Sequence, residues 1–485
     1  MRLGEYARYD GLALSELVKR RQVSRLELAE CSLAAIEAMN PQLNAVIEHY
    51  PVAVEQLNTG ADVGNRPFDG VPFLLKDIGS HDANVTYELG SRLTKGLRAP
   101  SFPSELVRRF RESGVTILGR TNVPELGSSF TTEPVLYGPT RNPWGLEHTA
   151  GGSSGGAAAA VASGMVPIAH AADSGGSIRW PAACCGVFGL KPSRNLNPVG
   201  PDAALPLHGC VAEHVISRTV RDSAAMLDAT AGPDVGAWCF TPRLSGSYLA
   251  EIYRPAGKLR LGVNLKALFP PTALQREVID ATWNAARLCE SLGHHVEEAA
   301  FEFDCESLLR AYYVLWISEL RQGIETLSAV TGRQPSLETL EPHNFAAYTA
   351  AKNLTATQLQ AAFGNLNTVA RAYGAYFERY DVMLTPAGSM APFRLGRLTA
   401  IDTTCLYDWY RAMTSYCPFT VTVNMAGIPA MSVPLAHNEG GLPIGSHFIA
   451  AMGQESLLLR LASQLEAARP WINRTPAIHA SALVL

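Results

Sequence analysis

Two serine-rich segments and one lysine carry the residue types that acyl transfer needs. Residues 151–156 read Gly-Gly-Ser-Ser-Gly-Gly, and residues 173–179 read Asp-Ser-Gly-Gly-Ser-Ile-Arg. The two glycines before Ser177 leave consecutive backbone N–H groups unshielded beside a hydroxyl, which suits a nucleophile with donors near a developing oxyanion. Lys76 ends an apolar run, where burial would lower the pKa of the amine and let it act as a base.

Other interpretations of these segments stay open at this point. The first segment also fits a tight turn that packs a helix against a sheet, and Lys76 could simply pair with Asp77. The nucleophile-elbow pattern G-x-S-x-G is matched at both Ser153 and Ser154, but an elbow needs a strand directly before it, and residues 141–145 are turn formers. A phosphate loop does not fit, because no Lys-Ser or Lys-Thr follows the glycines.

Taken together, the segments resemble the core of the amidase signature family of serine hydrolases. The family motif G-G-S-S-G-G is followed by D-[ST]-G-G-S-[IV]-R-x-P-A, and residues 173–182 read DSGGSIRWPA. Ser153 and Ser177 lie 24 positions apart, which is the spacing of the family's two catalytic serines, and residues 70–77 (GVPFLLKD) are similar to its lysine strand. The resemblance spans residues 12–471 with gaps. Further landmarks are Thr121, Asn122, Glu125, residues 186–192 (GVFGLKP) and residues 427–429 (GIP).

The resemblance implies a catalytic role for three residues. Ser177 would be the nucleophile, Lys76 the base, and Ser153, on a cis peptide bond, the serine that relays the proton between them. The amide would be cleaved through an acyl-enzyme that water then hydrolyses. Because a serine–lysine arrangement needs no histidine, we expect His170, the histidine nearest to Ser177 in the sequence, to be a supporting or core residue.

The resemblance also implies supporting groups around the three residues. The backbone N–H groups expected to bind the oxyanion are those of Ser174, Gly175, Gly176 and Ser177. The side chains expected to brace the loops without reacting are those of Ser154, Asp173 and Arg179. It implies no cofactor and no metal, and the nine cysteines include no C-x-x-C pair with zinc or redox spacing.

Two departures from the family pattern bear on the substrate. Trp180 stands where many relatives have a smaller side chain, and Gly127 lies in the loop that touches the acyl chain in fatty acid amide hydrolase. We expect both at the substrate site. Aromatic residues expected near the pocket or in its cap are Tyr137, Trp144, Tyr312, Tyr313 and Trp316.

In residues 131–144 (TTEPVLYGPTRNPW) and the ending over residues 464–471, the chain looks most like the branch that holds nylon-oligomer hydrolases and other xenobiotic amidases. The substrate would then be a small apolar or aryl amide, an oligoamide or a carbamate, the last being a urethanase activity. The alternative is a subunit of a tRNA-dependent amidotransferase, which releases ammonia from glutamine inside a complex.

The elements that must position these residues follow an α/β rhythm. A helix beginning at Ser104 is closed by Gly114 and followed by a strand over residues 115–118, and a helix over residues 276–292 is followed by a strand near Val296. This alternation predicts a mostly parallel central sheet. The family resemblance implies a large mixed central sheet with helices on both faces. An N-terminal helix is expected to start at a capping box, Ser24 with Glu27, and to stop at Asn40 and Pro41.

Domain organisation is predicted from the dispersal of the motifs. They lie between residue 70 and residues beyond 430 and must meet at one site, so we expect a single domain over residues 1–485. Residues 305–380 carry long helical patterns without a clear strand and are predicted to be a helical insertion or cap that contributes to the substrate pocket.

Composition limits the class of protein and its partners. The 485 residues are 47% hydrophobic and 17% charged, which excludes disordered and collagen-like chains. The net charge of −4 and the lack of any block of like charge make nucleic acid a poor partner. Residues 148–172 contain no charged side chain, but their glycines, serines and alanines do not suit a membrane span. We expect a cytoplasmic enzyme that binds a small amide and water, and leave a homodimer open.

Overall fold

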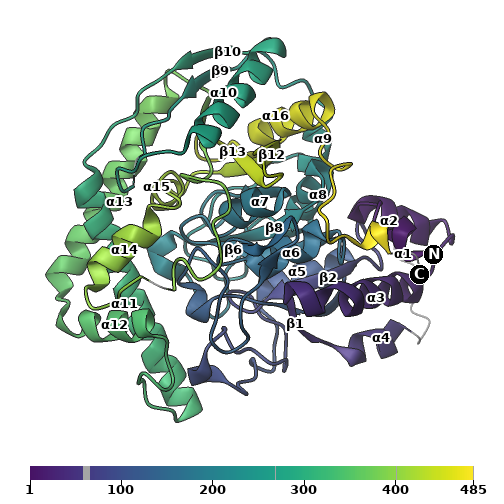
Figure 1. Ribbon diagram of the computed structural model, residues 1–485, viewed down its shortest axis with the longest axis horizontal. Coiled ribbons are helices and arrows are strands. Elements are labelled where there is room, and N and C mark those ends of the chain that lie inside the picture. Colours follow the sequence, from purple (N-terminus) through teal and green to yellow (C-terminus); the bar gives the residue numbers. More distant parts are fainter. Residues whose placement is uncertain (58–65, 268, 400, 484–485) are drawn as a thin grey trace.

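The computed structural model describes residues 1–57, 66–267, 269–399 and 401–483, which build one large twisted sheet flanked by helices (Figure 1). Within these ranges the strand order is β1-β3-β2-β6-β8-β7-β12-β13-β11-β9-β10. The strands are β1 (Val46–His49), β2 (Pro72–Lys76), β3 (Thr116–Thr121), β6 (Ile168–Asp173), β7 (Phe188–Lys191), β8 (Ala212–Ser217), β9 (Arg260–Val263), β10 (His295–Glu298), β11 (Val382–Pro386), β12 (Ala430–His437) and β13 (Pro443–Ile449). A separate two-stranded ribbon pairs β4 (Arg141–Asn142) with β5 (Gly145–Thr149).

The sheet is mixed, which confirms the family expectation and corrects the one based on alternation. Of the ten pairings formed by described residues, four are parallel and six antiparallel. Parallel pairs occur where a helix connects the strands: α5 (Glu105–Ser113) lies between β2 and β3, and α10 (Arg276–Ser291) lies between β9 and β10. The strands between these pairs include the hairpin of β12 and β13, and this part of the sheet is antiparallel.

Local signals set several element boundaries. Gly114 ends α5 with φ of +100°, as its position in the sequence predicts. Ser24 and Glu27 form the predicted capping box of α3 (Arg25–Leu43). That helix, however, continues through Pro41 to Leu43, so the expected stop at Asn40 is wrong. Pro41 lies in the last turn, where losing one backbone donor disrupts little of the helix, and the Asn44 amide still bonds the Asn40 carbonyl at 2.7 Å.

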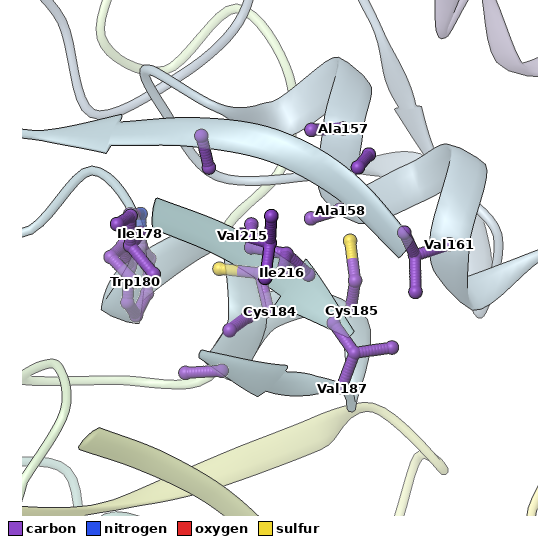
Figure 2. Close-up of a cluster of buried hydrophobic side chains, with 14 of the residues drawn as sticks. Ala157, Ala158, Val161, Ile178, Trp180, Cys184, Cys185, Val187, Val215 and Ile216 are labelled. Atoms are coloured by element: carbon purple, nitrogen blue, oxygen red, sulfur yellow. The ribbon is translucent and has the colours of Figure 1, made fainter. Parts of the chain in front are cut away.

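Two short buried helices follow the serine-rich segments. All eight residues of α6 (Gly155–Ala162) are buried, and so are all seven of α7 (Arg179–Cys185). The small side chains of α6 allow it to pack closely against α7 and the sheet. Figure 2 shows this cluster, with Ala157, Ala158 and Val161 from α6, Ile178 and Trp180 beside or in α7, Cys184, Cys185 and Val187 at its end, and Val215 and Ile216 from β8.

A group of helices lies along one side of the molecule. They are α11 (Cys305–Thr331), α12 (Pro342–Ala350) and α13 (Ala356–Phe377), with α14 (Leu406–Thr414) and α15 (Val421–Ala426) beside them (Figure 1). Residues 305–380, all of which are described, contain no strand. The other helices are α1 (Leu3–Tyr6), α2 (Gly11–Lys19), α4 (Pro51–Leu57), α8 (Val220–Thr230), α9 (Tyr248–Glu251) and α16 (Glu455–Ala468). No described helix combines the length and apolarity that a membrane span requires.

Candidate active site

Strand β2 brings Lys76 into the interior beside a serine. Every residue of β2 is buried, because the strand lies between β3 and β6. The ammonium of Lys76 donates to Ser153 Oγ at 2.8 Å and to the Ala172 carbonyl at 3.1 Å. The alternative pairing with Asp77 does not form, since that carboxylate instead forms an ion pair with Arg120 at 2.7 Å.

The burial of Lys76 changes its protonation. Removing the amine from water lowers its pKa from 10.5 to about 7, and the carboxylates of Asp173 and Glu213 act in the opposite direction. A substantial fraction of the amine is therefore neutral near pH 7 and can accept a proton. An unperturbed lysine would be almost entirely charged at that pH.

Ser153 lies in the turn between β5 and α6, after a cis peptide bond from Gly152. The turn packs so closely that a Cβ on Gly152 would lie 2.5 Å from the Ser129 carbonyl oxygen, so no larger residue fits there. Strand β5 runs up to Thr149, so the turn formers at 141–145 do not prevent a strand before this segment, contrary to the expectation. Ser154, next along the turn, donates its hydroxyl to the Ala172 carbonyl at 3.2 Å.

Ser177 lies in the loop that joins β6 to α7, and one buried ion pair holds this loop. The Asp173 carboxylate accepts from the Gly176 amide at 2.7 Å and from the Ile178 amide at 3.0 Å. Its oxygens also accept from Nε and Nη2 of Arg179 at 2.9 and 2.8 Å, and neither side chain is exposed. Burial alone would raise the pKa of Asp173, but the Arg179 guanidinium holds it well below its usual range.

Three backbone amides of the Ser177 loop are unoccupied. Those of Ser174, Gly175 and Ser177 have no acceptor among the described residues. The Gly176 amide differs from the prediction, because it already donates to Asp173. Gly176 has a φ of +138°, and a Cβ there would lie 2.5 Å from Thr420 Oγ1, so its contribution is to let the loop pass close to Thr420.

Two residues far along the chain support the ion pair and were not identified from the sequence. Asn424 Nδ2 donates to the Asp173 carboxylate at 2.8 Å and to its carbonyl at 2.9 Å, and Asn424 Oδ1 accepts from Arg179 at 2.5 Å. The Thr420 carbonyl accepts from Arg179 at 3.1 Å. Both residues belong to the short segment that leads into and forms α15, whose polar positions carry no motif.

Ser153 and Ser177 face one cavity of about 260 Å³. No hydrogen bond joins their hydroxyls among the described contacts, although Lys76 and Ser153 are in contact. The other side chains of the cavity are mostly apolar. They include Ile78, Leu126, Phe130, Pro206, Leu207, Val211, Tyr312, Trp316, Leu320 and Met413, with Glu213 and Glu319 as the acidic members.

The two residues expected at the substrate site lie in different places. Gly127 lines the cavity, where a Cβ would lie 3.6 Å from Ser153 Oγ. Trp180 is in the core, contrary to the prediction: it is 2% exposed, donates its indole N–H to the Phe130 carbonyl at 2.9 Å, and stacks on Phe393. The large Trp180 side chain therefore fills space in the core behind Phe130, which lines the cavity.

Of the other aromatic residues expected near the pocket, two line the cavity and three lie elsewhere, half-buried. Tyr312 and Trp316 of α11 line the cavity, and the Tyr312 hydroxyl donates to the Ser174 carbonyl at 2.7 Å. Tyr137 instead contacts Arg120, Trp144 packs on His437, and Tyr313 packs on Tyr407 and Tyr410.

His170 lies behind Lys76 and not in the cavity. Its Nδ1 accepts from the Lys76 backbone amide at 3.3 Å, and its Nε2 lies 2.8 Å from Glu213. A larger cavity, of about 690 Å³, lies elsewhere and has Leu57 and Arg66 in its wall. No serine, cysteine or lysine lines that cavity among the described residues, and we assign it no role.

Comparison with known proteins identifies the family. The family model described as Amidase matches residues 27–459. The chain belongs to the amidase signature family. This amidase is 35% identical over 480 residues to the 6-aminohexanoate-cyclic-dimer hydrolase of Pseudomonas sp. (strain NK87), with 97% of this chain and 96% of that protein covered.

Two solved structures resemble the amidase along almost its whole length. A 6-aminohexanoate cyclic dimer hydrolase complexed with substrate has a TM-score of 0.91 at 34% identity, with 97% of this chain and 99% of that chain covered. A bacterial aryl acylamidase has a TM-score of 0.87 at 27% identity, with 96% of each covered. The predicted branch is thereby confirmed, and the amidase is an enzyme that hydrolyses amide C–N bonds.

Proposed function

We propose that this amidase cleaves small-molecule amides with Ser177 as nucleophile and Lys76 as base, relayed through Ser153. The contact that carries the proposal is the 2.8 Å hydrogen bond between Lys76 Nζ and Ser153 Oγ, at the wall of a cavity that Ser177 also lines. A lysine that is partly neutral at pH 7 can accept the proton that a serine must lose to attack a carbonyl.

The proposed reaction has two steps. In the first, Ser177 Oγ bonds to the substrate carbonyl carbon while its proton passes to Ser153 and the Ser153 proton passes to Lys76. The tetrahedral intermediate carries its negative charge toward the free amides of Ser174, Gly175 and Ser177, and collapses as the C–N bond breaks. The leaving nitrogen takes back a proton from Lys76 through Ser153. In the second step, water attacks the acyl-enzyme with the same lysine as base, and the acid leaves.

The lining of the cavity supports an apolar substrate. Aromatic and aliphatic side chains form most of it, so an apolar or aryl amide or an oligoamide would exchange water contact for apolar contact on binding. The names of the relatives agree, since one acts on a 6-aminohexanoate cyclic dimer and another is an aryl acylamidase. A carbamate presents a carbonyl of similar geometry, and urethanase activity belongs to the same proposal.

We propose further that residues 1–485 form one amidase domain, with residues 305–380 as a helical insertion that contributes to the pocket. Four side chains of α11 that line the cavity, those of Tyr312, Trp316, Glu319 and Leu320, support this role. The cytoplasmic location and a homodimer stay predictions from the sequence.

Labelling by a fluorophosphonate probe tests the nucleophile. We expect wild-type enzyme to be labelled and to hydrolyse a chromogenic anilide, and Ser177→Ala to lose both. Ser163→Ala is the matched control, because this buried serine lies just after α6 and, among the described residues, its hydroxyl bonds only the Ala160 carbonyl. Labelling that persists in Ser177→Ala but is lost from another serine variant would overturn the assignment.

The same purified protein distinguishes this function from the alternative, a subunit of an amidotransferase. A free-standing hydrolase cleaves the anilide when purified alone. A subunit of an amidotransferase would instead copurify with partner subunits and release ammonia from glutamine only in their presence.

A further inference from the structure

One charged side chain in the cavity wall has no part in the proposed chemistry. Glu319 lies on α11, where Tyr312, Trp316 and Glu319 follow one another at intervals of four and three residues and so share a face of the helix. That face lines the cavity. Glu319 is half-buried, and its neighbours in the cavity wall, such as Trp316, Leu320 and Leu207, are apolar, so a positive group of a ligand would meet few competing partners there.

No such partner is supplied by the described part of the chain. No Lys, Arg or His side chain within it lies within 4.0 Å of the Glu319 carboxylate. His208 is close enough to interact with it electrostatically, but burial lowers the pKa of that imidazole below its ordinary value, so it is neutral at pH 7. Arg321, two residues further along α11, pairs with Glu325 instead.

The other ionisable groups of the cavity are already engaged. Lys76 is held by Ser153 and the Ala172 carbonyl, and Glu213 contacts His170 at 2.8 Å and accepts from the Ser80 amide at 2.9 Å. Glu319 therefore leaves the cavity with an uncompensated negative charge, and this charge is available to a ligand.

Glu319 also has one backbone contact, which suggests a merely structural role. Its Oε1 accepts from the Leu207 amide at 3.0 Å. Leu207 and His208 both have positive φ, +45° and +54°, so the loop over residues 206–209 is strained and the contact helps to hold it. A neutral amide oxygen could accept the same bond, so this contact does not explain why the residue is a carboxylate.

We propose that Glu319 forms a subsite for a positively charged group of the substrate, a primary ammonium on an alkyl chain. The inference rests on the proposed function, because it places the ammonium on a molecule whose amide lies at Ser177. The Tyr312 hydroxyl contacts the Ser174 carbonyl, so this end of the α11 face lies at the nucleophile loop. Glu319 is seven residues further along, on the order of 10 Å along the helix axis.

The length of the spacer follows from this separation. A 6-aminohexanoyl group has about as many chain bonds as two extended residues, which together span about 7 Å. A hydrogen bond between the ammonium and the Glu319 carboxylate would cover the rest of the separation. The methylene groups of the substrate would then lie along Trp316 and Leu320. Short ammonium substrates such as glycine anilide would not reach.

The test compares substrates that differ only in charge. The first pair is 6-aminohexanoyl-4-nitroanilide and its methyl isostere heptanoyl-4-nitroanilide. The second pair places the charge on the leaving side: N-(6-aminohexyl)-4-nitrobenzamide and N-heptyl-4-nitrobenzamide. We expect wild-type enzyme to favour the ammonium member of at least one pair by about tenfold or more in kcat/KM, as a charge-assisted hydrogen bond gives.

The variant Glu319→Gln separates charge from structure, because its amide oxygen can still accept from the Leu207 amide. We expect it to lose about tenfold or more on the favoured ammonium substrate and less than about twofold on the methyl isostere. Glu325→Gln, which removes an exposed charge from the same helix, should retain the wild-type preference. Equal losses on both members of a pair, or no preference in either pair, would overturn the subsite.

The two proposals fail in different ways. If wild-type enzyme hydrolyses the methyl isosteres and Ser177→Ala does not, the proposed nucleophile stands whatever the charge preference. If Ser177→Ala retains that hydrolysis, the proposed function fails independently of Glu319. A charge preference that persists in Glu319→Gln would place the cation elsewhere in the cavity.

Discussion

Two buried lysines occupy similar places in this fold and have different surroundings. Lys76 ends β2 and Lys191 ends β7, and both strands are apolar and buried. Burial lowers the pKa of each to about 7; for Lys191 the Arg179 guanidinium lowers it further, while Asp173 and Glu455 oppose the shift. By pKa alone either could act as a base at neutral pH.

Their contacts separate them. Lys76 Nζ reaches Ser153 Oγ and lines the cavity, whereas Lys191 Nζ donates to the Pro192 carbonyl at 2.7 Å and does not line it. A lowered pKa therefore shows that a lysine is buried, and access to a serine and to a ligand decides whether it can do chemistry.

The largest expected difference between the lysines is in activity. Lys76→Met removes the proposed base and should lower kcat/KM on an anilide by about 10²- to 10⁴-fold, the usual contribution of a general base. Methionine is similar in shape to lysine, and the Lys191 amine contacts no serine. Lys191→Met should therefore retain activity within about tenfold of wild type. Steady-state kinetics with melting curves as a folding check measure both. If Lys191→Met folded well but was as inactive as Lys76→Met, the proposed difference in role between the two lysines would be wrong.

A smaller effect is expected in the pH dependence. Since Lys76 acts as a base only when neutral, kcat/KM should rise with pH and level off above about 7, and at pH 6 it should be about a tenth of its plateau. Lys191→Met should show the same profile, because it leaves Lys76 untouched. A profile that is flat from pH 5.5 to 8 in wild-type enzyme would contradict the role of Lys76.

The smallest effect is on stability, and here the lysines should behave alike. Each has a folded-state pKa near 7 and an unfolded value near 10.5, so between these values the unfolded chain binds more protons. The free energy of unfolding of wild type should therefore rise with pH relative to either Met variant, by at most about 1.4 kcal/mol per pH unit.

Denaturant unfolding at pH 7, 8 and 9 measures these differences. The full stabilisation is present only near pH 10 and is lost as the pH falls toward 7. A pH-dependent difference for one lysine and none for the other would show that only one of them titrates as a buried group.

Lys76 and Lys191 also show how much of the fold and of the site can be predicted from the sequence. A lysine at the end of an apolar strand predicts burial, and that holds for both Lys76 and Lys191. Nothing local distinguishes them; the family motif singles out Lys76. Short-range signals such as the Ser24 capping box and Gly114 place helix ends correctly, because the interactions involved span only a few residues.

Features that depend on distant contacts were missed. The core position of Trp180 depends on Phe130 and Phe393, and the engagement of the Gly176 amide depends on how the loop folds around Asp173. Glu319 has a signal that could have been noticed, since it shares a helix face with Tyr312 and Trp316. The direction in which that face points depends on long-range packing, which cannot be predicted from one sequence.

The buried ion pair has a consequence for the synthesis of this enzyme. Asp173 and Arg179 are joined to Asn424, which is 251 positions beyond Asp173. A nascent chain that has emerged only as far as residue 400 already contains Lys76, Ser153 and Ser177, yet it lacks the segment that satisfies the pair holding the nucleophile loop. The contacts of Asn424 with this pair can therefore form only after nearly the whole protein has been made.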